Sequence, residues 1–158
     1  MYRAAELWID GALFLLVLLP IVVSDIRYRK IPDVYVFSGL ALISTRRIVF
    51  SSSPSLWFLV DAAVGFCFIL LFWYFSKRKI GLGDAKLSGL IALLVGIPAW
   101  IISLFLAALS GILYAVVRIA RGTMLKSDRI PFAPFLGAGA LVGFAHIIVF
   151  GRFDYGLF

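Results

Sequence analysis

The sequence predicts an all-α protein, a polytopic membrane helix bundle with six transmembrane helices. Of the 158 residues, 63% are hydrophobic and the mean hydropathy is +1.09, whereas an ordinary soluble domain is about 45 to 50% apolar. Only 15% of the residues are charged, and they gather in short clusters between long uncharged stretches. Several of those stretches approach the roughly 20 residues with which a helix crosses a hydrocarbon core about 30 Å thick.

The first three spans are runs of apolar residues that few charges interrupt. Residues 7–24 form the first run and residues 56–75 the third. The second run, residues 34–50, is the weakest, because Arg46 and Arg47 lie inside it. If this run spans, both side chains are expected to extend to a membrane interface, since a cation inside the hydrocarbon is costly.

Prolines lie at the boundaries of the last three spans. The fourth run, residues 87–97, is short and ends at Pro98. We expect Pro98 to mark a tight corner into the fifth run, residues 99–117. The sixth run, residues 132–150, follows Pro131 and is rich in Gly and Ala. The whole chain is therefore expected to form a single integral-membrane domain.

Basic residues predict how the six spans are oriented. Eleven of the 15 Lys and Arg residues follow the first, third and fifth runs. They are Arg27, Arg29, Lys30, Lys77, Arg78, Lys79, Lys86, Arg118, Arg121, Lys126 and Arg129. By the positive-inside rule these three basic loops are cytoplasmic, so both termini face outward from the cytoplasmic (inner) membrane of the cell. The net charge of +7 then reflects topology and contact with anionic lipids, and no nucleic-acid partner is expected.

Two of the eight acidic residues are predicted at this same face. Asp25 ends the first span, and Asp84 opens the fourth, flanked by Gly81 and Gly83. Either acid alone is compatible with a helix terminus at the interface. A close pair of carboxylates can hydrolyse a peptide bond, because repulsion favours one ionised group to activate water and one protonated group to polarise the carbonyl. The two glycines lack a Cβ and allow an extended substrate strand to approach.

Three stretches on this face carry family motifs. Residues 25–33 read DIRYRKIPD, residues 81–87 read GLGDAKL, and residues 130–136 read IPFAPFL. These stretches resemble the motifs of type IV prepilin peptidases, which are polytopic aspartyl proteases of the GxGD kind. Their motifs are an Asp with a basic stretch before Ile/Leu-Pro-Asn/Asp, then GxGDxKL, then IPFGPFL. Ala133 stands here where the family often has Gly.

The resemblance implies an activity and a site. Asp25 and Asp84 would be the catalytic pair of a membrane endopeptidase that removes the leader of prepilin or pseudopilin precursors at the cytoplasmic face. Cleavage would follow a leader Gly, ahead of a hydrophobic segment that stays in the bilayer. We also expect five residues of the matching motifs to bind substrate or support the site. These are Gly81, Gly83, Lys86, Pro131 and Pro134.

No cofactor or metal is expected. Cys67 is the only cysteine and His146 the only histidine, so we expect a small core side chain and a buried, hydrogen-bonded imidazole. The chain has no insert with paired CxxC motifs, which in longer family members is associated with methylation, so methyltransferase activity is not expected. Asp33 is expected to cap the second helix and Asp61 to have a structural role. The sequence leaves the oligomeric state open.

Two alternative functions compete with this interpretation. Presenilin-like and signal-peptide-peptidase-like proteases also use GxGD, but their first acid usually follows Tyr and they end in Pro-Ala-Leu, whereas Ser24 precedes Asp25 here. An ion-coupled transporter would use Asp25, Asp61 and Asp84 to bind ions. No inverted repeat is apparent between the halves of the sequence, which disfavours the transporter.

Overall fold

The computed structural model describes residues 4–50, 56–76, 81–123, 125 and 130–150. Within them the chain is all-helical, as predicted, with no strand. The elements in order are α1 (Ala4–Tyr28), α2 (Asp33–Phe50), α3 (Trp57–Phe75), α4 (Leu82–Ala120) and α5 (Ala133–Phe150). Three of these helices, α1, α3 and α4, are long and apolar enough to cross a membrane, and α5 is a shorter apolar helix.

α4 combines the fourth and fifth predicted spans, and a sharp bend divides it. The bend lies at Gly96, whose φ of 75° and ψ of 165° are not helical. Glycine adopts a positive φ without the clash that a Cβ would cause. Pro98 then falls in the first turn of the second half, where its missing N–H costs nothing. The corner was therefore predicted in the right region, but glycine forms it two residues before the proline. The number of membrane crossings stays a prediction.

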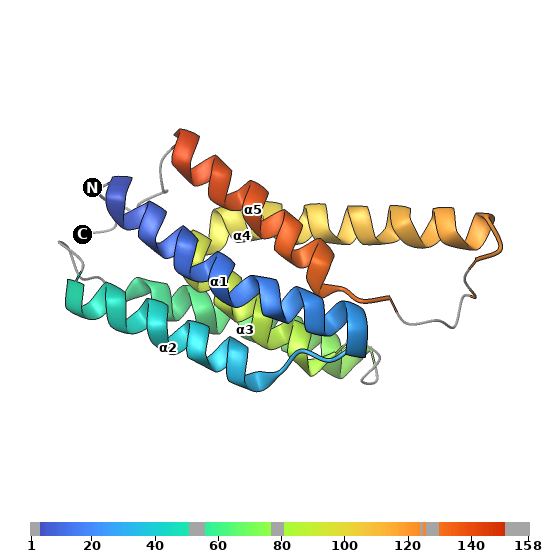
Figure 1. Ribbon diagram of the computed structural model, residues 1–158, viewed down its shortest axis with the longest axis horizontal. Helices are drawn as coiled ribbons and strands as arrows, with labels where there is room; N and C mark the ends of the chain where they lie inside the picture. Colours follow the sequence, from blue (N-terminus) through green and yellow to red (C-terminus); the bar gives the residue numbers. More distant parts are fainter. Residues whose placement is uncertain (1–3, 51–55, 77–80, 124, 126–129, 151–158) are drawn as a thin grey trace.

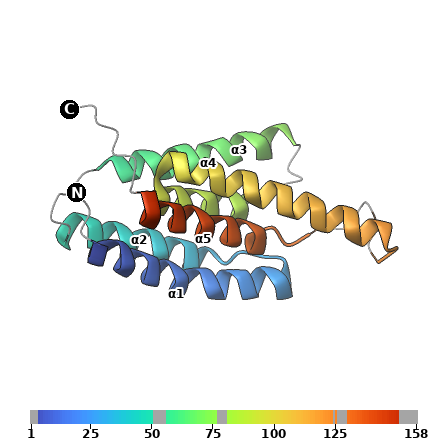
Figure 2. The same ribbon diagram turned by 90° about the horizontal axis from the view of Figure 1, so that it is seen from above.

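The helix ends form two opposite faces of the bundle (Figures 1 and 2). The C-terminal ends of α1 and α3 and the starts of α2, α4 and α5 lie together, and the second half of α4 extends beyond them. The start of α1 and the end of α5 lie at the other face. The described helix ends that flank the loops predicted to be basic and cytoplasmic thus lie on the same side. Which side of the membrane that is stays a prediction.

The core of the bundle is the first half of α4, where residues 87–96 are all buried. This segment packs against α3, and the second half of α4 packs against α5. Small residues allow the close contacts: Gly65 of α3 lies on Ala92, and Gly139 of α5 lies on the backbone of Ser103. Small residues at helix interfaces are typical of membrane bundles, whose helices gain packing energy from close approach.

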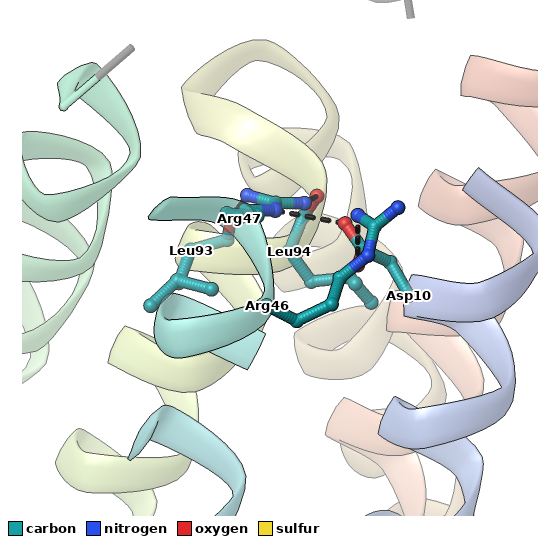
Figure 3. A network of polar contacts seen from close by, with 5 residues as sticks. All are labelled: Asp10, Arg46, Arg47, Leu93 and Leu94. Carbon is teal, nitrogen blue, oxygen red and sulfur yellow. Dashed lines mark hydrogen bonds and ion pairs between the residues drawn. The ribbon is translucent and has the colours of Figure 1, made fainter. Parts of the chain in front are cut away.

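A buried ion network joins α1, α2 and α4 (Figure 3). Arg47 donates to Asp10 Oδ2 at 2.8 Å, and Arg46 donates to Asp10 Oδ1 at 2.7 Å. The Arg47 guanidinium also donates to the carbonyls of Leu93 and Leu94. These carbonyls lie in the last turn before the Gly96 bend, where a helix lacks its own donors. The prediction of an extension to an interface was wrong for Arg47, because this side chain is only 1% exposed and caps the interrupted helix from inside the bundle, whereas for Arg46, 11% exposed, it stays a prediction.

Other expectations about single side chains had mixed outcomes. Cys67 is exposed on α3, so the prediction of a core residue was wrong. Lipid is as apolar as the core, so hydrophobic character does not distinguish the inner from the outer face of a membrane helix. His146 is half-buried and Asp61 is buried. Within the described residues, no group of three or more His, Cys, Asp or Glu side chains could hold a metal ion.

Candidate active site

Asp25 connects the last turn of α1 to the beginning of α5. Its side chain is 6% exposed, and Oδ2 accepts a hydrogen bond of 2.9 Å from the backbone N–H of Ala133. α5 begins at Ala133, and the first N–H groups of a helix lack partners within the helix. A carboxylate is well suited to this position because it satisfies those donors and complements the helix dipole.

Asp84 lies in the first turn of α4 and is half-buried. Its backbone N–H donates to the carbonyl of Gly81 at 3.1 Å, which forms a turn just before the helix. A Cβ on residue 81 would lie 3.1 Å from Asp84 Oδ2, so glycine leaves room for the carboxylate to fold back over the turn.

Asp25 and Asp84 line one cavity of about 1010 Å³, and they are close enough for their charges to interact. The turn with Gly81 and Gly83 and the connection between α1 and α2 line part of this cavity. Apolar side chains of α3 and of the second half of α4 line another part: Phe68, Ile69, Phe72, Trp73, Leu104 and Ala108. The cavity therefore combines charged side chains, among them the acidic Asp25, Asp33 and Asp84, with an apolar wall.

Comparison with known proteins identifies the family of the chain. A sequence model of the type IV leader peptidase family matches residues 12–116, which include both Asp25 and Asp84. The chain belongs to the type IV leader peptidase family. The resemblance predicted from the three motifs is thereby confirmed.

Among curated members of the leader peptidase family, the chain is similar to the "Prepilin leader peptidase/N-methyltransferase" of Bacillus subtilis (strain 168). The two sequences are 27% identical over 138 residues, which are 86% of this chain and 55% of the relative. The chain thus spans about half the length of that curated relative. No solved structure matches the chain.

Within this chain, the cavity brings together most of the residues predicted for the site. Asp25, Asp84, Gly81, Gly83 and Lys86 all line it. Pro131 and Pro134 are half-buried beside the start of α5 and are not among its lining residues, whereas Ile130 and Phe132 are. The two prolines are therefore better placed to support the start of α5 than to contact substrate.

Sequence reasoning missed two groups of cavity residues. The first is Ile31 and Asp33, which lie in the DIRYRKIPD motif, so a signal was present. Asp33 is the first residue of α2, and Lys86 Nζ donates to its Oδ1 at 2.6 Å. Its predicted capping role stays a prediction, and the ion pair was not foreseen. The second group is the apolar wall on α3, for which the uniformly apolar sequence carried no signal.

Proposed function

We propose that this protein is a membrane aspartyl endopeptidase that removes the leader of type IV prepilin or pseudopilin precursors, with Asp25 and Asp84 as its catalytic pair. One observation carries the proposal: both carboxylates line one cavity in a chain of the type IV leader peptidase family. The pair acts as one unit that shares a proton, because two adjacent carboxylates do not ionise independently.

Hydrolysis by such a pair follows from the charges. The ionised carboxylate takes a proton from a water molecule as the oxygen attacks the scissile carbonyl, and the protonated carboxylate donates to the carbonyl oxygen. When the tetrahedral intermediate collapses, the C–N bond breaks, the new amine takes up the proton of one carboxyl group, and a hydroxyl proton of the intermediate returns to the other carboxylate, so the pair again holds one proton. The reaction consumes one water molecule and is proposed to use no cofactor or metal. The proposal extends to peptide hydrolysis and not to N-methylation.

The cavity fits a substrate with a polar and an apolar part. The substrate strand would pass the turn of Gly81 and Gly83, which lines the cavity. The space left by the missing side chains is taken by the Asp84 carboxylate at Gly81 and by Ile31 at Gly83, so these glycines shape the turn. The hydrophobic segment after the cleavage point would pack on the apolar wall formed by α3 and α4. We propose that the reaction takes place at the cytoplasmic face of the cell membrane, where leader and hydrocarbon meet, which the positive-inside rule supports. Basic loop residues outside the cavity would contact anionic lipid headgroups.

The experiment is cleavage of a prepilin-like precursor by purified protein in detergent. Asp25→Asn and Asp84→Asn are each expected to abolish cleavage, because asparagine keeps the shape but supplies neither acid nor base. Asp61→Asn is the matched control, since Asp61 is a buried acid that does not line the cavity. The control is expected to retain substantial activity. Full cleavage by either catalytic-pair variant contradicts that assignment, and cleavage without an ion gradient argues against a transporter.

A further inference from the structure

The two helix ends that carry the carboxylates have little direct contact with each other. Asp25 lies in the last turn of α1 and Asp84 in the first turn of α4. The packing of α1 against α4 is much smaller than that of α4 against α3 or α5. Catalysis by a carboxylate pair depends on the separation of its two groups. Other contacts must therefore fix this separation. One route runs through α5, whose Ala133 N–H binds Asp25, and a more direct one runs through the connection between α1 and α2, residues 29–32.

This connection is tied to the turn that carries Asp25. The N–H of Arg29 donates to the carbonyl of Asp25 at 2.9 Å, and Ser24 Oγ donates to the carbonyl of Lys30 at 2.9 Å. Arg29 has a φ of 52°, the left-handed conformation that ends many helices. The chain therefore turns sharply after α1, and the position of residues 29–32 follows that of Asp25.

The same segment contacts the chain on both sides of Asp84. Before it, a Cβ on Gly83 would lie 2.8 Å from the Cβ of Ile31, so the absent side chain allows Ile31 to pack directly on the turn. After it, Lys86 Nζ lies 2.6 Å from Asp33 Oδ1, at the start of α2. Lys86 Nζ also lies 5.5 Å from the centre of the Phe37 ring on α2, within range of a cation–π contact.

We propose that the Asp33–Lys86 ion pair and the Ile31–Gly83 contact form a clamp that sets the separation of Asp25 and Asp84. Asp33 and Lys86 are then positioning residues, and this inference rests on the proposed peptidase function. Their side chains are 57% and 25% exposed, and exposed ion pairs contribute little to folding stability. Breaking the pair therefore changes the geometry of the site while the fold persists.

Charge reversal tests the clamp. Lys86→Met and Asp33→Asn are each expected to lower kcat about 10- to 100-fold with KM within about 3-fold, because small misplacements of reacting groups are costly. The double variant Asp33→Lys/Lys86→Asp restores the pair with the charges exchanged. We expect it to recover kcat to within about 3-fold of the wild type. Thermal unfolding of all variants is expected to match that of the wild type.

Two kinetic outcomes overturn the clamp. One is an unchanged kcat in both single variants. The other is a double variant that is no more active than the single variants, combined with a raised KM in Lys86→Met. That result assigns Lys86 to direct contact with substrate. In the double variant the ion pair can form again with its charges exchanged. Position 86 then no longer carries a lysine that could contact substrate. The double variant therefore separates positioning from binding.

A distance measurement separates failure of the clamp from failure of the proposed function. Nitroxide labels on Ile26→Cys and Leu82→Cys, in a Cys67→Ser background, report the separation of the two helix ends by electron paramagnetic resonance. Both labelled positions are exposed. The distance distribution is expected to broaden in Lys86→Met and to narrow again in the charge-exchanged variant, whether or not the protein cleaves a leader. A distribution that does not change overturns the clamp.

Discussion

Replacing Arg47 by methionine tests the buried ion network at the bend of α4. The Arg47 guanidinium makes three hydrogen bonds, to Asp10 and to the carbonyls of Leu93 and Leu94. Methionine has a similar length and no donor. The variant therefore removes one partner of a buried charge and leaves two carbonyls next to the Gly96 bend without this donor.

The expected loss follows from these contacts. Removing one partner of a buried ion pair costs about 3 to 5 kcal/mol, and each buried carbonyl left unsatisfied costs about 1 to 3 kcal/mol. Arg46 still pairs with Asp10 in the variant and offsets part of this loss. We therefore expect the free energy of unfolding to fall by about 3 to 5 kcal/mol.

Arg46→Met is the matched control, because Arg46 makes one hydrogen bond in this network and lies at its edge, 11% exposed. Its loss is expected to be smaller than that of Arg47→Met, about 1.5 kcal/mol, the lower end of the range for a hydrogen bond to a charged group, because Arg47 still pairs with Asp10. The assay is denaturant unfolding in detergent micelles, followed by tryptophan fluorescence. Equal stability losses in Arg46→Met and Arg47→Met would refute the view that Arg47 caps the interrupted helix.

Three other predictions concern packing and catalysis. Gly139→Ala is expected to destabilise the bundle by about 1 to 3 kcal/mol, because the added methyl meets the backbone of Ser103. Gly111→Ala is the control, because a methyl added there would lie 3.8 Å from its nearest neighbours. Equal Tm values for the two variants contradict the prediction. Gly83→Ala is expected to lower the cleavage rate, because the added methyl pushes against Ile31. Adding Ile31→Ala to this variant is expected to restore part of the rate. A double variant as impaired as Gly83→Ala alone would refute the clash with Ile31 as the cause. Cleavage rate plotted against pH is expected to be bell-shaped, since low pH removes the base and high pH removes the acid; a rate that rises steadily with pH contradicts a shared proton.

The three motifs predicted more of the site than of the packing. Asp25, Asp84 and Gly83 were identified as candidates because their residue types and order matched a family pattern, and all three line the cavity. The positions of Arg47 and Cys67 were predicted wrongly. In a soluble protein apolar residues point inward and charges point outward, but lipid removes that rule, so hydropathy alone does not assign a face to a membrane helix.

The sequence by itself determined the helical class, the family, the region of the corner near Pro98 and the acids worth testing. These depend on composition, on the length of apolar runs and on local motifs, all of which are visible in the linear sequence. Only the tertiary structure decided that Asp25 accepts a hydrogen bond from the first N–H group of α5, that Arg47 caps the break at Gly96, and that Asp33 pairs with Lys86. Each of these contacts joins residues of different helices. The position of one helix relative to another is set by side-chain packing between them, which the sequence of either helix alone does not specify.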